Sequence, residues 1–356
     1  MSMRVFIKKN IATFIGLFII NLFVAVFAFY LLPKRFFYDA ALIAFDKGNE
    51  IGFLGSYPLT ILFYKVTGLR YLPFPIIALI QYPILIYTLY KIGVPGNFDK
   101  INVKNILAYL GFFMMAIFMS MPSKEFITFL YLALIVFLYR NDSISFWKSI
   151  VLSMFLLALF GVLYRPYFLL IPIIAFAMYA ASFIKFKNKT VTTIFYGLIM
   201  AVFLSLSYGL LIGQYLSESS REVVNMDRMN SADANSMISS PVKPDTWYGE
   251  TIGILYGFVS VNIPVNGLKH FLSPQIIAFV IWELLLFYIL LVRLSRCLKN
   301  REKYKYELWV LLILFSYSIV QGVFEPDLGT AIRHKMGVFP LIYYALYYEY
   351  FRKELQ

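Results

Sequence analysis

Long apolar runs separated by short polar stretches dominate the chain. A helix that crosses a membrane needs roughly 17–25 predominantly apolar residues, and runs near this length recur about ten times. Turns rich in proline, glycine and charged residues separate them. The pattern predicts an all-α polytopic membrane protein that forms a single integral membrane domain over 1–356. The predicted spans are 11–32, 73–91, 105–121, 124–140, 148–164, 167–184, 190–213, 273–292, 308–324 and 336–351.

The segment 33–72 contains an apolar run that is too short to span. This run, 56–69, is interrupted by Tyr57-Pro58 and by Gly68. We therefore expect it to form a surface helix that lies along the membrane face.

The segment 214–272 is the longest stretch between predicted spans. Its first half is very polar and has no hydrophobic period, which predicts irregular structure. Its second half begins near Trp247, is apolar and contains Gly253, Gly257 and Pro264. We expect this half to dip into the membrane as a re-entrant or surface segment, lined by protein or by a watery cavity.

The composition supports a place in lipid. Of the 356 residues, 61% are hydrophobic and 14% charged, the mean hydropathy is +0.74, and a soluble protein would carry about 25% charged residues. The single Cys297 excludes an intrachain disulfide framework. The run 11–32 ends in LLPKRF rather than at a small-residue cleavage site, so we expect an uncleaved first helix.

The net charge of +13 indicates sidedness. With the N-terminus in the cytoplasm and alternation through the predicted spans, the whole excess of Lys and Arg falls on the cytoplasmic side, as the positive-inside bias predicts. Both termini are then cytoplasmic, and 33–72 and 214–272 face outward. The charge is thus explained by topology, and we expect no nucleic-acid partner.

Charged residues gather in 325–335, EPDLGTAIRHK, between two apolar runs. Such a cluster is costly unless it lies at a water-filled site, which suggests an active site. Arginine suits phosphate because its planar fork offers paired hydrogen bonds. For Arg165 and Lys124, snorkelling at the interface is the alternative. The outward cations are Arg70, Lys124, Arg165, Arg333, His334 and Lys335.

Acidic residues on the same face supply candidate bases. Glycosyl transfer to a hydroxyl needs a group that takes the proton, and Asp39, Glu325 or His334 would serve. A structural ion pair of Asp39 with Arg35 is the alternative. The outward acids are Asp39, Asp46, Glu50, Glu125, Glu325 and Asp327.

Two further acidic features are weaker signals. Glu325 and Asp327 would also offer oxygens to a divalent ion, but two carboxylates are a weak signal, and we predict no metal. Glu283, inside a predicted span, is either functional or a neutral hydrogen-bonded group. Nucleotide-binding, serine hydrolase and metalloprotease motifs do not occur, and we predict no cofactor.

Two stretches resemble known membrane enzymes. FFYDA followed by YPLTILFYKVTG resembles the start of lipid-carrier-dependent glycosyltransferases of the GT-C type. The closing GTAIRHKMGVFPLIYYAL resembles the last outward turn of bacterial repeat-unit polymerases of the Wzy type, which make O-antigen and capsule. Two motifs of these families are missing from this sequence. The loop lacks a paired Arg-x10-Gly arrangement, and eleven positions after His270 stands Ile281 instead of the glycine of the ligase pattern.

The resemblance implies a GT-C-like fold with a long periplasmic loop in the bacterial inner membrane. It implies polymerisation of undecaprenyl-diphosphate-linked oligosaccharide units on the periplasmic face, with membrane lipid and a chain-length regulator as further partners. Arg333 and Arg165 would hold the diphosphate with support from Lys335, Lys124, Arg70 and Asp327, and the base would be Asp39 or His334 near Glu325. The alternatives are a flippase for lipid-linked oligosaccharides, an O-antigen ligase and a single-sugar transferase.

Overall fold

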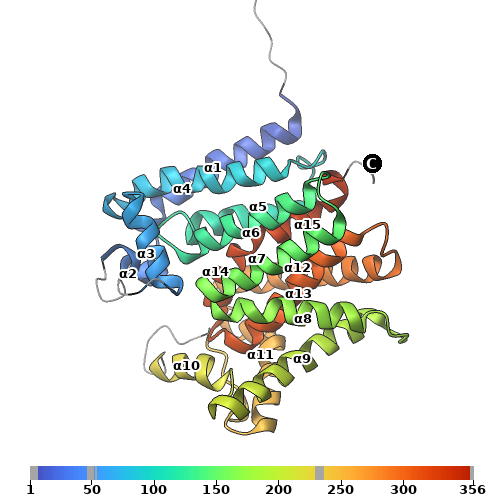
Figure 1. Ribbon diagram of the computed structural model, residues 1–356. Helices are drawn as coiled ribbons and strands as arrows, with labels where there is room; N and C mark the ends of the chain where they lie inside the picture. Colours follow the sequence, from blue (N-terminus) through green and yellow to red (C-terminus); the bar gives the residue numbers. More distant parts are fainter. Residues whose placement is uncertain (1–6, 46–51, 53, 229–235, 353–356) are drawn as a thin grey trace, which may run out of the picture. The chain divides into compact units, whose positions relative to one another are not determined.

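The computed structural model describes residues 7–45, 52, 54–228 and 236–352, and in these ranges the chain is helical without a named strand (Figure 1). It divides into two compact units, one of 1–144 with 335–356 and the other of 145–334. The first unit contains α1 (Lys9–Leu31), α2 (Tyr38–Phe45), α3 (Ser56–Val66), α4 (Phe74–Ile92), α5 (Val103–Phe118), α6 (Lys124–Arg140) and α15 (Phe339–Phe351). The second contains α7 (Phe146–Leu163), α8 (Leu170–Ala181), α9 (Lys189–Ile212), α10 (Val223–Arg228), α11 (Trp247–Asn262), α12 (Pro274–Lys299) and α13 (Lys305–Phe324), and α14 (Leu328–Gly337) crosses the boundary.

Every apolar run predicted as a span contains a helix. Among the described residues, six helices are long and apolar enough to cross a membrane: α1, α4, α7, α9, α12 and α13. The helix α5 and the stretch 166–181 are apolar but shorter. The fold is thus all-helical and has the character of a membrane protein, while the larger number of spans stays a prediction.

Helix starts follow local capping chemistry. The side chain of Asn102 accepts a hydrogen bond from Asn105 N at 3.0 Å before α5, and Ser123 accepts one from Phe126 N at 3.2 Å before α6. Such caps satisfy backbone donors that have no partner within the helix. Short polar residues between the apolar runs therefore fix where these helices begin.

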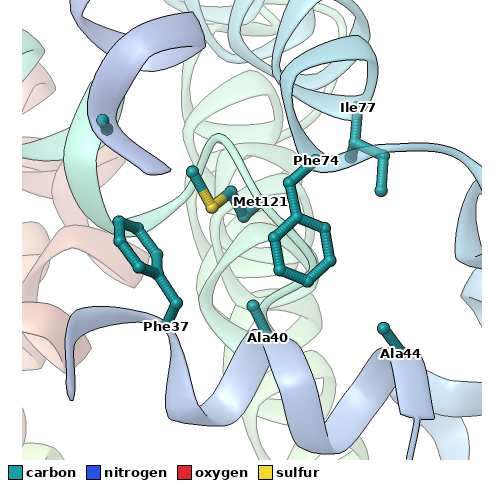
Figure 2. Close-up of a cluster of buried hydrophobic side chains, with 7 residues drawn as sticks. Phe37, Ala40, Ala44, Phe74, Ile77 and Met121 are labelled. Carbon is teal, nitrogen blue, oxygen red and sulfur yellow. The ribbon is translucent and has the colours of Figure 1, made fainter. Parts of the chain in front are cut away.

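The predicted helix within 56–69 is present as α3. After its last turn Gly68 adopts φ +73°, a left-handed conformation that glycine takes without steric cost. Figure 2 shows how the neighbouring α2 packs: Ala40 and Ala44 face Phe74 of α4, with Phe37 and Met121 beside them. This apolar cluster fixes α2, and hence Asp39, within the first unit.

Helix α13 forms the centre of the second unit. Every residue from Tyr306 to Val323 is buried, and α13 packs against α8, α9, α11 and α12. Where α11 meets α13, a Cβ added to Gly257 would lie 1.9 Å from the Gly322 carbonyl oxygen. The two backbones approach so closely because both positions lack a side chain, as at many packed helix pairs in membranes.

We expect Gly257→Ala to destabilise the second unit. The added methyl would overlap Gly322 and lie 2.4 Å from Arg221 Nη1, and overpacking of this kind typically costs about 1–3 kcal/mol. The midpoint of thermal unfolding in detergent should fall. Gly16→Ala in α1 is the control, because nothing lies within 4 Å of its added Cβ. An unchanged midpoint for Gly257→Ala would contradict the close packing of α11 on α13.

The first half of 214–272 was predicted to be irregular. This was wrong for 218–228, whereas 236–246 contains no α-helix. The chain is helical from Glu218 to Arg228, and the second half begins with the regular helix α11. The place of α11 relative to the membrane stays a prediction. Buried polar groups hold this region: Arg221 donates from Nη1 to the carbonyls of Gly253 at 3.2 Å and Gly322 at 2.9 Å. These long-range contacts need no hydrophobic period, so the local pattern did not reveal them.

Glu250 supports the same region from α11. Its buried carboxylate accepts hydrogen bonds from Ser205 Oγ at 2.5 Å, from Ser217 N at 3.1 Å and from Ser217 Oγ. A buried charge is tolerated when it is hydrogen-bonded in this way. The carboxylate therefore connects α9, α11 and the segment after α9.

Candidate functional site

The residues predicted to carry chemistry divide between the two units. Those of the first unit are Asp39, Arg70, Lys124 and Lys335, and those of the second are Arg165, Glu325, Asp327, Arg333 and His334. Asp46 and Glu50 lie outside the described residues. Each set is described within its own unit.

In the second unit, His334 and Glu325 form a pair. His334 Nδ1 lies 2.8 Å from Glu325 Oε1, and the side chains are 15% and 5% exposed. Gln321 Nε2 donates to the same oxygen at 3.2 Å and to the Ala331 carbonyl at 3.0 Å. A carboxylate on one ring nitrogen fixes the orientation of an imidazole and directs proton transfer to the other nitrogen. The arrangement suits a general base.

Asp327 is engaged as a helix cap. Its carboxylate accepts from Thr330 N and from Thr330 Oγ1, each at 2.7 Å, at the start of α14. Side-chain oxygens at this position satisfy the first backbone donors of a helix. Asp327 therefore fixes the beginning of the helix that carries Arg333 and His334.

The two predicted arginines differ in exposure. Arg165 is buried, 4% exposed, and begins the short 3-10 helix Pro166–Leu169. Its guanidinium lies 5.9 Å from the ring centroids of Tyr164 and Tyr167, within cation–π range. Arg333 on α14 is half-buried.

In the first unit, Asp39 pairs with Lys124. Lys124 Nζ lies 3.3 Å from Asp39 Oδ2, and Tyr57 donates from its hydroxyl to Asp39 Oδ1 at 3.0 Å. The ammonium also lies 3.8 Å from the Tyr57 ring centroid. The sequence suggested Arg35 as the partner of Asp39; the Arg35 side chain lies outside the described part. In the sequence pattern Tyr57 only interrupts the apolar run, which gives no sign of this contact.

A hydrogen-bonded turn supports Lys124. Ser123 N donates to the Tyr64 hydroxyl at 3.1 Å, and the Gln81 amide contacts the same oxygen. Burial raises the pKa of the Tyr64 hydroxyl above its ordinary value, so this group stays protonated. The contacts tie α3, α4 and the start of α6 together.

The remaining predicted residues either hydrogen-bond to the backbone or are buried. Arg70 donates from Nε to the Ala44 carbonyl at 2.8 Å, which fixes the end of α2. Lys335, Glu125 and Glu283 are buried at 4%, 0% and 1% exposure. Burial of this degree requires paired or hydrogen-bonded surroundings for a charged group.

Lys124→Met tests whether the Asp39–Lys124 pair is structural. Removing one partner of a largely buried ion pair typically costs about 3–5 kcal/mol, because the other charge is left uncompensated. We expect Lys124→Met to lower the midpoint of thermal unfolding in detergent. The double variant Asp39→Asn, Lys124→Met should recover part of this loss. Unchanged stability in the single variant together with lost activity would instead indicate a substrate-binding lysine.

No group of three or more His, Cys, Asp or Glu side chains suited to a metal ion occurs in the described ranges. Comparison with protein-family models, with curated proteins and with solved structures finds no match for this chain.

Proposed function

We propose that this chain is a membrane glycosyltransferase that polymerises lipid-diphosphate-linked oligosaccharide units on the periplasmic face of the bacterial inner membrane. The observation that carries the proposal is the His334–Glu325 pair, at 2.8 Å, on the segment between two apolar helices. A general base next to apolar helices, which can contact a lipid tail, is suited to transfer of a sugar from a lipid-linked donor to an acceptor hydroxyl.

In the proposed reaction His334 Nε2 takes the proton of the acceptor hydroxyl. The hydroxyl oxygen then bonds to the anomeric carbon of the donor sugar, whose bond to the diphosphate oxygen breaks. Glu325 stabilises the imidazolium that forms, as a carboxylate partner does in other histidine bases. The lipid diphosphate leaves with the bonding electron pair.

Cations stabilise the departing diphosphate in this proposal. Arg333 precedes the base on α14, and Arg165 is the other arginine of the same unit that was predicted to hold the diphosphate. Guanidinium groups suit phosphate oxygens, and fixed charges act most strongly where charge develops in the transition state. Lys124 and Tyr57 engage both oxygens of Asp39. We therefore assign Asp39 to holding these two side chains in place rather than to taking the proton.

The glycan pattern of a deletion strain tests this function. A polymerase predicts single repeat units attached to their final carrier, with long chains restored by the wild-type gene. Absence of units from the cell surface would indicate a flippase, and unattached polymer would indicate a ligase. Either of these patterns would overturn the proposal.

A further inference from the structure

Three connecting segments meet at one end of the second unit. Helices α7, α9 and α13 begin at this end, and α8 and α12 finish there. Arg301 Nη2 donates to the carbonyl of Ser182, and the ring centroids of Phe146 and Tyr306 lie 5.0 Å apart. These contacts bring together the segments 145–148, 182–189 and 299–306, which we call the basic surface.

The basic surface carries a large excess of positive charge. Its three segments contain eight lysines and arginines and one acidic residue, Glu302. The exposed lysines are Lys148, Lys185, Lys187, Lys189, Lys299 and Lys303. The Glu307 carboxylate on α13 is already engaged, because Arg293 Nε lies 2.7 Å from its Oε1 and Arg296 Nη2 lies 3.0 Å from its Oε2. The three segments therefore offer far fewer carboxylates than cations, and they attract an anion from outside the chain.

Aromatic side chains lie among these cations. The Arg301 guanidinium lies 4.2 Å from the ring centroid of Phe183, within cation–π range. The ring of Tyr179 lies edge-on between Phe183 and Trp147, at centroid distances of 5.0 Å and 6.3 Å. Trp147, Phe183 and Phe186 are exposed. Exposed aromatic rings beside lysines are typical of the membrane–water interface.

An exposed apolar stripe on α8 leads away from the basic surface. Ile173, Phe176 and Ala180 are exposed and lie three or four residues apart, so they share one side of the helix. Phe183 follows directly after the end of α8. A soluble polyanion such as RNA would contact only the cations and would leave this stripe uncovered, whereas a lipid would contact both parts.

We propose that the basic surface binds an anionic phospholipid, with the phosphodiester between 182–189 and 299–306 and an acyl chain along the exposed side of α8. The predicted topology places this end of the unit at the cytoplasmic face, where anionic lipids attract lysines. The positive-inside bias explains why lysines lie at this end, but it requires neither the Arg301–Ser182 contact nor the adjoining stripe. The lipid site is independent of the polymerase proposal, because it uses none of the residues assigned to that reaction.

Quenching of Trp147 fluorescence by brominated lipid tests the proposal with the full-length protein in nanodiscs. The probe is phosphatidylglycerol with brominated acyl chains in a phosphatidylcholine bilayer, and the Trp147 signal is the difference between the wild type and Trp147→Phe. We expect phosphatidylglycerol to be enriched at Trp147. The triple variant Lys185→Gln, Lys187→Gln, Lys189→Gln should lower its binding constant relative to phosphatidylcholine by about tenfold or more, since each lysine contributes to the attraction.

The matched control removes the same charge from the first unit. It is Lys8→Gln, Lys9→Gln, Lys100→Gln, at three exposed lysines. This variant should leave the enrichment at Trp147 unchanged. An equal loss in both triple variants would mean that total charge, rather than the basic surface, recruits the lipid, and the proposal would be wrong.

Two further measurements complete the test. Lys299→Gln with Lys303→Gln changes the opposite segment and should also weaken the enrichment, so that the proposal does not depend on the folding of one variant. Glycerophosphoglycerol has the same headgroup without acyl chains, and at millimolar concentration it should not displace the lipid. Displacement would identify a site for soluble phosphodiesters and would overturn the proposal, as would equal quenching of the wild type by brominated phosphatidylglycerol and brominated phosphatidylcholine.

Discussion

Replacing His334 with Ala is expected to slow chain elongation by about 10²–10⁴-fold, the usual contribution of a positioned general base. The measured quantity is the rate of polymer formation from lipid-linked repeat units in nanodiscs. The physical reason is the 2.8 Å contact with Glu325, which orients the ring for proton transfer at Nε2. Glu325→Gln should lower the rate less, because the amide keeps a contact but does not stabilise the imidazolium.

His334→Asn separates the base from the hydrogen bond. The Asn amide is able to donate to Glu325 in place of Nδ1, but it has no nitrogen that accepts a proton at neutral pH. We expect the same large loss as for Ala, with an unchanged unfolding midpoint. Elongation at the wild-type rate in His334→Asn would show that the histidine only maintains the fold around α14.

Arg333→Ala is expected to leave the protein in the membrane and to abolish long glycan chains. Loss of one fixed donor to a developing charge typically costs about 10²–10³-fold in kcat. Arg333→Lys should recover part of the rate, because the charge remains while the paired geometry of the guanidinium is lost. The readout is kcat and KM for the lipid-linked donor, together with chain length in cells.

Normal chain length in Arg333→Ala would contradict the assignment of this arginine to the diphosphate. A rise in KM with unchanged kcat would indicate that Arg333 binds the ground state and the transition state equally, which would also contradict a role specific to the departing diphosphate. Lys243→Ala, at an exposed position outside the candidate site, serves as the control for expression and membrane insertion.

The helices were predictable because each apolar run is continuous and ends at a cap or a turn residue. The short helix α3 was predictable although its run is interrupted, because its limited length and Gly68 set it apart from the longer runs. The segment after α9 was not predictable in this way. Its order depends on Arg221 reaching Gly322, a contact between residues far apart in the chain that leaves no periodic signal.

The candidate site was predictable as a set of residue types but not as pairs. The charged stretch 325–335 was visible because few charges occur nearby, and its His334–Glu325 pair lies within one short segment. The partnership of Asp39 with Lys124 depends on how α2 and α6 pack, and the role of Tyr57 depends on α3. Only the folded first unit brings these three residues together.

The enclosure of α13 has a consequence for how the protein is made. A helix that is buried from Tyr306 to Val323 cannot keep lipid neighbours, and its Gln321 side chain needs protein partners. Its neighbours α8, α9, α11 and α12 all precede it in the chain. The ribosome therefore synthesises α13 after these four helices. The second unit can bury α13 only once this last helix has been inserted among them.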